Sequence, residues 1–300
     1  MRRRAGSLLL AAAVLAGCSG DGTGPTGAAD AAVTTVTAAT TDAVTPSTAV
    51  TPSTAVTPST DAAMTYRGAV LAAGPVAYWP LDDTTPTAAA EVGPGGFTAT
   101  YAGTVVVGEP PAVDGGGTAV AFDGSGGHLY VGDASGPAAR ALAPSPSLTV
   151  ELWFRPAAVP PGTVGQLARW RWYGWGLQVV DGRLSGSLWL PGPTPVALAG
   201  PALAEGVWHH VVLTKDDSTA RLYVDGVPAA EVPATGPVHY VALDPAQDCC
   251  GSGGGVAFGR DGDVSTDAAH FLTGGLDEVA VYDRALSADE VAAHAAFRRR

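Results

Sequence analysis

The side chains best suited to ligand binding lie in one run, residues 169–175, which read Arg-Trp-Arg-Trp-Tyr-Gly-Trp. In a β-strand alternate side chains point to opposite faces, so Trp170 and Trp172 would share one face and the two arginines the other. Indole rings suit the C–H faces of sugars, and guanidinium groups suit carboxylates, so we predict a ligand-binding surface here. Its residues are Arg169, Trp170, Arg171, Trp172, Trp175 and, from the following hairpin, Trp189. The alternative is that these indoles fill the protein core.

Oxygen-bearing side chains recur at every second position of one segment, at Asp261, Asp263, Ser265 and Asp267. Calcium prefers oxygen ligands, and this spacing is that of the first half of an EF-hand loop. Thr266 stands where that loop requires glycine, and Leu272 stands where it ends in glutamate. Asp261, Asp263 and Asp267 are therefore candidate calcium ligands, with a solvated polar loop as the alternative.

Two of the three cysteines in the sequence, Cys249 and Cys250, are adjacent. In an oxidising compartment two free thiols would be unusual. The pair would either close a strained vicinal disulfide or link two chains, and the sequence leaves both open. Because the sequence has no CxxC redox spacing and no zinc-type cluster, we interpret this pair as structural.

The charge balance argues against nucleic acid as a partner. The chain has 16 Lys and Arg against 28 Asp and Glu, a net charge of −12. An acidic surface repels phosphate backbones.

The sequence also lacks the Gly-x-Ser-x-Gly elbow of hydrolases and a Gly-rich phosphate loop with lysine. We therefore expect no enzyme activity and no soluble cofactor.

The N-terminus has the features of an export signal. Residues 2–4 are basic, and the apolar segment 8–16 is shorter than the about 20 residues that span a bilayer. Leu-Ala-Gly-Cys at 15–18 resembles the bacterial lipobox, whose cysteine becomes the first mature residue and carries lipid. We predict a signal peptide at 1–17, lipidation of Cys18 and anchoring on the outer face of the bacterial cell envelope. An ordinary secretory signal is the alternative.

Residues 18–63 have the composition of a disordered linker. They contain no aromatic residue, and Ala-Val-Thr-Pro-Ser-Thr occurs at 43–48, 49–54 and 55–60. Such a segment cannot build a core. We predict a lipid-anchored stalk that carries a folded domain at 64–300.

The folded domain is predicted to be all-β. In residues 148–156 polar and apolar side chains alternate, with Leu148, Val150, Leu152 and Phe154 on the apolar face. Further strands are predicted at 76–81, 119–124, 128–131, 176–180, 184–190, 208–214, 221–224, 255–259 and 276–282, with tight turns at Asp181-Gly182 and Asp225-Gly226. This pattern favours an antiparallel two-sheet sandwich. One short C-terminal helix follows, opened by the capping box Ser287-Ala288-Asp289-Glu290 and reaching about Phe297.

Eight motifs, in order across residues 76–290, resemble those of the laminin-G-like, concanavalin A-like jelly rolls. They are Trp79-Pro80-Leu81-Asp82, Ala121-Phe122-Asp123-Gly124, Leu148-Thr149-Val150-Glu151-Leu152-Trp153-Phe154, Trp208-His209-His210-Val211, Leu222-Tyr223-Val224-Asp225-Gly226, Phe258-Gly259-Arg260, Gly275-Leu276-Asp277-Glu278-Val279 and Tyr282-Asp283-Arg284-Ala285-Leu286-Ser287.

The resemblance implies a binding module. In this family calcium often ties the first strand to the last, which makes Asp82, Asp83 and Asp277 candidate ligands. Related glycanases carry Glu-x-Asp-x-x-Glu on one strand, and this sequence has no such triplet. We therefore expect a non-catalytic module for extracellular glycan, aided by calcium. A protein-binding adhesive scaffold and a divergent glycan-active enzyme are the alternatives.

Overall fold

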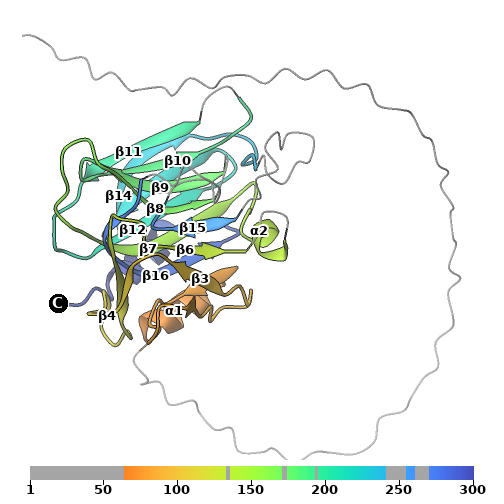
Figure 1. The fold of residues 1–300 in the computed structure, drawn as a ribbon. Coiled ribbons are helices and arrows are strands. Elements are labelled where there is room, and N and C mark those ends of the chain that lie inside the picture. The colour runs from red at the N-terminus through yellow and green to blue at the C-terminus, as the bar shows by residue number, and fades with distance from the viewer. Residues whose placement is uncertain (1–63, 133–135, 171–173, 193–194, 241–254, 261–269) are drawn as a thin grey trace, which may run out of the picture. The chain divides into compact units, whose positions relative to one another are not determined.

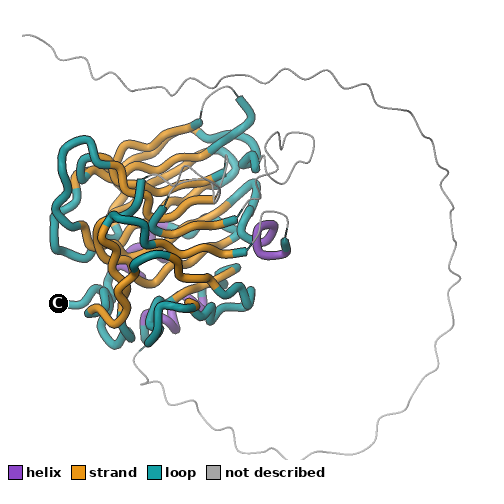
Figure 2. Tube along the Cα trace, viewed as in Figure 1, coloured by secondary structure: helices purple, strands orange, loops and turns teal. Residues whose placement is uncertain are grey.

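The computed structural model describes residues 64–300, except 133–135, 171–173, 193–194, 241–254 and 261–269. The strands of these described residues form two antiparallel sheets of eight strands each, packed as a sandwich (Figure 1, Figure 2). The predicted all-β sandwich is thus confirmed. In order across sheet A, the strands are β14 (Val227–Pro233), β13 (Thr219–Val224), β12 (His209–Lys215), β7 (Leu148–Pro156), β16 (Thr273–Tyr282), β5 (Ala119–Asp123) and β4 (Val105–Glu109), with β1 (Ala77–Trp79) also paired to β16.

Sheet B packs on sheet A and is drawn with its strands one above another in Figure 1. In order across the sheet they are β11 (Val196–Ala202), β10 (Arg183–Leu188), β9 (Trp175–Val180), β8 (Val164–Trp170), β15 (Val256–Phe258), β6 (His128–Val131), β3 (Ala99–Ala102) and β2 (Ala88–Ala89). The helices of the described part are α1 (Tyr66–Ala72), α2 (Pro137–Ala141) and α3 (Ala288–Ala295).

The main core lies between the two sheets. The predicted apolar face of β7 is buried there, together with Leu177 of β9 and Phe258 of β15 from sheet B. Side chains at alternate positions of a strand point to the same face, so each strand contributes every second residue to this core. The other residues of each strand lie on the outer faces of the sandwich.

Part of the outer face of sheet A is covered by helices. Tyr66 and Val70 of α1, Val291 of α3 and Trp153 of β7 belong to a second buried cluster. This cover explains why β7 is buried along both faces. The capping box that the sequence predicts at the start of α3 is confirmed, because Ser287 accepts from the Glu290 N–H and the Glu290 carboxylate accepts from the Ser287 N–H.

Both predicted Asp-Gly turns are confirmed. The φ angles are 50° and 71° at Asp181 and Gly182, and 51° and 79° at Asp225 and Gly226. Positive φ at both central residues gives a two-residue hairpin turn whose twist matches that of its strands. These turns join β9 to β10 and β13 to β14, and so fix the register of two hairpins.

One prediction about the strands is wrong. Residues 169–175 do not form a single strand, because β8 ends at Trp170 and the antiparallel β9 begins at Trp175. Arg169 and Gly176 are direct cross-strand partners in this hairpin. The alternation expected along the run therefore does not apply across it.

Several predicted features lie outside the described residues. They are the signal peptide, Cys18 and the stalk at the N-terminus, and Arg171, Trp172, Cys249, Cys250, Asp261, Asp263 and Asp267 in the folded domain. Among the described residues, no helix has the length and apolar character needed to cross a membrane.

Candidate functional site

A continuous row of side chains crosses the outer face of sheet B. Each member is the direct cross-strand partner of the next, from β3 to β11, in the order Thr100, Tyr130, Ala257, Arg169, Gly176, Ser187 and Ala197. The row brings four hydrogen-bonding side chains to one face of the sheet, those of Thr100, Tyr130, Arg169 and Ser187.

Three polar side chains converge on Gly176, and we call Gln166, Arg169, Gly176 and Ser187 the Gly176 patch. A Cβ at Gly176 would lie 3.0 Å from Ser187 Oγ, 3.5 Å from Gln166 Nε2 and 3.7 Å from Arg169 Cγ. A glycine inside a strand is unfavourable for the strand itself and often marks a close approach by a ligand or another chain segment. Here it lets the side chains of Ser187, Gln166 and Arg169 pack closely over the strand.

Gln166 provides an acceptor that the protein does not use. Its amide nitrogen donates to the carbonyls of Leu177 and Ala168, at 2.7 Å and 3.1 Å. Its amide oxygen is buried and has no hydrogen-bond partner. Because Gln166 has no exposed surface, its side chain supports strands β8 and β9 and does not itself face a ligand.

The structure places the residues of the predicted aromatic surface in two different environments. Arg169 is half-buried on the outer face of sheet B, and Trp189 is half-buried just after β10. Trp170 and Trp175 lie instead in the core between the sheets, with 0% and 1% of their surface exposed. These two cannot stack on a ligand, so the prediction for them is wrong.

The two buried tryptophans are held by α2. Trp170 Nε1 donates to the Ala139 carbonyl and Trp175 Nε1 to the Leu142 carbonyl, each at 3.2 Å. Buried indoles need a partner for their N–H group, and the end of a short helix provides carbonyls without helical partners. Both rings therefore fix α2 to sheet B.

The candidate calcium ligands of the first and last strands have unequal roles. Asp277 is 1% exposed; its Oδ2 accepts from the Ala112 N–H at 2.8 Å, while its Oδ1 is buried without a partner. Asp82 accepts from Arg67 at 2.6 Å in a partly exposed ion pair. Asp83 is already used, since its two oxygens accept from the Ala90 N–H at 3.1 Å and the Tyr101 hydroxyl at 2.9 Å.

Charge repulsion accumulates around Asp277. Burial, together with the negative charges of Glu278 and Asp82, raises the pKa of Asp277 well above its ordinary value. Burial raises the pKa of Glu278 to about 7. Glu278 and Leu81 also have positive φ angles, 55° and 61°, which non-glycine residues adopt mainly at functional or strained sites.

The donor set fits calcium in part. The unpartnered Asp277 oxygen is a suitable ligand, and a divalent cation would relieve the repulsion between the neighbouring carboxylates. Asp83 does not fit, because both of its oxygens have protein partners. Within the described ranges, no three His, Cys, Asp or Glu side chains form a group that could hold a metal ion.

The sequence did not predict a cluster of ionisable groups around Glu151. Glu151 is fully buried, and its Oε1 lies 2.7 Å from His210 Nε2, 2.9 Å from His294 Nδ1 and 3.1 Å from the Tyr66 hydroxyl. Its Oε2 accepts from the Tyr282 hydroxyl at 2.7 Å. Burial alone would raise the pKa of Glu151, but the hydrogen bonds from the two histidines outweigh it and hold the pKa well below the ordinary value.

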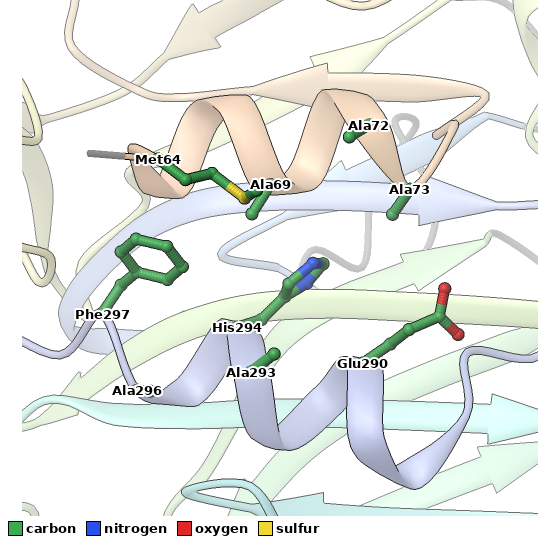
Figure 3. A pocket seen from close by; sticks show the side chains of 9 residues that line it. All are labelled: Met64, Ala69, Ala72, Ala73, Glu290, Ala293, His294, Ala296 and Phe297. Atoms are coloured by element: carbon green, nitrogen blue, oxygen red, sulfur yellow. The ribbon is translucent and has the colours of Figure 1, made fainter. Parts of the chain in front are cut away.

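This Glu151 cluster lies beneath α1 and α3. Figure 3 shows the groove between these helices, with alanines of α1 facing α3 and the His294 ring directed inward between them. Burial lowers the pKa of His294, but its hydrogen bond and charge interaction with Glu151 outweigh burial and raise it. Since Glu151 has no exposed surface, the cluster ties helices to the sheet and is not placed to act on a substrate.

Comparisons with known proteins agree with this architecture. A family model described as concanavalin A-like lectin/glucanases superfamily matches residues 123–292. No curated protein matches the chain significantly in sequence.

Solved structures with a similar fold include receptor-binding domains and an enzyme. The receptor-binding domain of the botulinum neurotoxin C/D mosaic serotype has a TM-score of 0.55 and 12% identity, over 75% of this chain and 51% of that one. The botulinum neurotoxin DC binding domain in complex with SialylT has a TM-score of 0.54 and 10% identity, over 75% and 51% of the two chains. Trypanosoma rangeli sialidase has a TM-score of 0.54 and 20% identity, over 74% and 32%. The match thus spans about half of each neurotoxin domain, and at these identities it establishes the fold alone.

Proposed function

The chain belongs to the concanavalin A-like lectin/glucanases superfamily, and on that premise we propose that it is a non-catalytic binding module for extracellular glycan. The observation that carries this proposal is the Gly176 patch. Its arginine and serine are partly exposed on the outer face of sheet B and can form hydrogen bonds with sugar hydroxyls.

Aromatic contact would come from Tyr130 and Trp189, which are half-buried and lie on or next to the same row. Such rings stack on the apolar face of a sugar while the polar groups set its orientation. Among the solved structures of similar fold, one neurotoxin domain is described in complex with SialylT and one with rat synaptotagmin II. These descriptions are compatible with either class of ligand; the partly exposed aromatic and polar side chains of the row favour glycan, with a surface protein as the second candidate.

A glycan-active enzyme is less well supported by the described residues. Glycoside hydrolysis uses two carboxyl groups about 5–10 Å apart, flanking the bond that is cleaved. The Gly176 patch consists of Gln166, Arg169, Gly176 and Ser187, none of which carries a carboxylate. The Glu151 carboxylate with its two histidines is sealed beneath the helices.

We propose calcium as a structural aid at Asp277, with Asp82 beside it. The support is the unpartnered buried oxygen of Asp277 and the raised pKa values of Asp277 and Glu278. A cation held there would stabilise the contact between the first strand and the last one. It would act on the scaffold and not on the ligand at the Gly176 patch.

The proposed place of action is the outer face of a bacterial cell envelope. The support is in the sequence, namely the short apolar segment that ends in Leu-Ala-Gly-Cys and the repeat-rich segment before residue 64. A lipid at Cys18 would anchor the chain, and the stalk would hold the sandwich away from the membrane. Metabolic labelling with a palmitate analogue tests this; the label should be lost in Cys18→Ser.

The experiment that tests the function is an array screen of the full chain against soluble and immobilised glycans. We expect binding to a subset of the glycans, and we expect Arg169→Ala to remove that binding while the chain stays folded. Binding to no glycan on the array would contradict the proposal and direct the search to protein partners.

A further inference from the structure

A hollow lies on the opposite side of the sandwich from the Gly176 patch, on the outer face of sheet A. Its floor is built from small residues on neighbouring strands, because Ala121 of β5 pairs with Gly275 of β16, and Gly275 pairs with Arg155 of β7. The hollow has a volume of about 480 Å³. It also includes Gly274 and Glu205, and we call it the Arg155 trough. Ligand pockets in proteins have volumes of about 300–1,000 Å³.

One wall of the Arg155 trough is a stacked pair of side chains. The guanidinium carbon of Arg155 lies 5.0 Å from the centre of the Trp208 ring, within the range of a cation–π contact. Arg155 also donates to Glu109 at 2.8 Å, and 25% of the arginine side chain and 31% of the glutamate side chain remain exposed. A fixed guanidinium, a carboxylate and an indole thus meet at one edge of the hollow.

The stacking of Arg155 on Trp208 depends on the absence of a side chain at Gly275. A Cβ at Gly275 would lie 2.8 Å from Trp208 Cη2 and 3.3 Å from Arg155 Nε, closer than the two side chains could accept. Glycine weakens a strand because it loses more conformational freedom on folding than other residues. Its presence in the long strand β16 lets Trp208 lie over the sheet and keeps the floor of the trough low.

The charges around the trough select against anionic ligands. Arg155 is the cation of this group, and its charge is balanced by Glu109 at 2.8 Å. Glu205 adds a second, exposed carboxylate at the rim. A guanidinium beside a carboxylate offers hydrogen-bond donors and acceptors side by side, which suits adjacent hydroxyl groups. The apolar ring edge of Trp208 suits the C–H groups of the same molecule.

We propose that the Arg155 trough is a second carbohydrate site, which binds a neutral sugar ring through vicinal hydroxyls. Arg155 donates to one hydroxyl, Glu109 accepts from its neighbour, and the sugar ring lies over Ala121, beside the Trp208 ring that covers Gly275. The proposal shares its ligand class with the proposed function but uses no residue of the Gly176 patch. Sites on both sheets would let one domain hold two glycan segments at once.

The test is a titration of the ¹⁵N-labelled full chain with cellohexaose, xylohexaose and maltohexaose, and with hexagalacturonate as the charged counterpart. The Trp208 indole resonance is assigned from Trp208→Phe and followed during the titration. We expect at least one neutral hexasaccharide to shift this resonance and hexagalacturonate to leave it unchanged. The affinity read from it should fall about tenfold or more in Arg155→Met, because hydrogen bonds to a charged group are lost.

A second variant keeps the proposal testable if Arg155→Met unfolds. Ala121→Leu fills the floor of the trough without changing Arg155, Glu109 or Trp208, and it should weaken the same affinity about tenfold or more by steric exclusion. Arg221→Ala, on strand β13 of the same sheet and outside the trough, is the matched control and should leave the affinity unchanged. The proposal is overturned if no neutral probe shifts the Trp208 resonance, if hexagalacturonate shifts it more strongly, or if Ala121→Leu binds as well as the natural chain. A shift abolished by Arg169→Ala alone would support the Gly176 patch and overturn the second site.

Discussion

His294 Nδ1 lies 2.9 Å from Glu151 Oε1, and this contact joins the C-terminal helix α3 to strand β7 in the middle of sheet A, across 143 positions of sequence. Tyr66 of α1 reaches the same oxygen at 3.1 Å. Both helices are therefore held to the sheet by one buried carboxylate. The stability of the sandwich should depend on this group more than on any surface ion pair.

Glu151→Gln should destabilise the protein strongly. The amide keeps one oxygen acceptor but replaces the other with a donor and removes the negative charge that faces two histidines. Removing one partner of a buried charged network costs about 3–5 kcal/mol. Chemical denaturation of the full chain would measure this loss. The matched control is Glu231→Gln, whose side chain is 62% exposed in its pair with Arg221 and should cost at most about 1 kcal/mol. Equal losses in both variants would contradict this account of the cluster.

Stability should also decline as the pH rises above neutrality, and His294 should account for part of the decline. The pKa of His294 is raised in the folded state. Between the ordinary pKa of histidine and the raised pKa of folded His294, the folded chain holds a proton that the unfolded chain has released. The stabilisation from this proton is therefore complete below the ordinary pKa of about 6.5 and is lost as the pH rises through the folded-state pKa. The free energy of unfolding at pH 6 and pH 9 should differ less in His294→Asn than in the natural chain. An equal difference would show that His294 does not titrate in this way.

Glu151 acts at the opposite end of the pH range. Its pKa is lowered, so its contribution is present above the ordinary value of about 4.3 and is lost only as the pH falls through the folded-state pKa. The Glu151–His294 pair should therefore stabilise the fold most in mildly acidic solution, between the ordinary pKa values of a glutamate and a histidine, about 4.3 and about 6.5.

Calcium should stabilise the fold through Asp277. A ligand that binds only the folded state adds RT ln(1 + [L]/Kd), about 2.7 kcal/mol at a hundredfold excess over Kd. We expect millimolar calcium to raise the midpoint of thermal unfolding relative to EDTA, and Asp277→Asn to remove that rise. Asp83→Asn is the control, because Asp83 is bound to Tyr101 and the Ala90 N–H and should leave the rise intact. An unchanged rise in Asp277→Asn would exclude Asp277 as a ligand.

The tryptophans should separate into a structural and a binding class. Trp170→Ala opens a cavity in the core and should cost about 3–5 kcal/mol of stability. Trp189→Ala removes a half-buried ring from the outer side of sheet B and should cost less, while weakening glycan binding. The free energy of unfolding and the affinity, measured on both variants, check this. The distinction would fail if Trp189→Ala bound glycan as well as the natural chain.

The parts of the fold that could be predicted from the sequence are those with strong local signals. The alternation in β7, the two Asp-Gly turns and the Ser287 capping box are each encoded within a few residues, and all are confirmed. Two of the strands that were missed, β11 and β14, lack such signals. β11 reads Val-Ala-Leu-Ala-Gly-Pro-Ala, and β14 contains Pro228 and Pro233, which weaken the pattern of a strand.

The candidate site could be predicted only in part, because burial depends on contacts that are distant in sequence. Alternation placed Glu151 on the outer face of β7, but nothing near it in sequence shows that α1 and α3 cover that face. Trp170 and Trp175 were misplaced because alternation does not show which face of a strand packs against the other sheet. Arg169 was placed on the face opposite to Trp170, which is correct since it depends on neighbouring residues of one strand.

The most direct test of the central claim is the affinity of the full chain for a glycan that the array identifies, measured by calorimetry with Arg169→Ala and Arg221→Ala side by side. Arg169 belongs to the Gly176 patch, and Arg221 lies on strand β13 of sheet A. The account predicts that Arg169→Ala weakens binding about tenfold or more, as expected for the loss of hydrogen bonds to a charged group, while Arg221→Ala binds like the natural chain. Equal affinities for all three proteins would contradict a binding site on the outer face of sheet B.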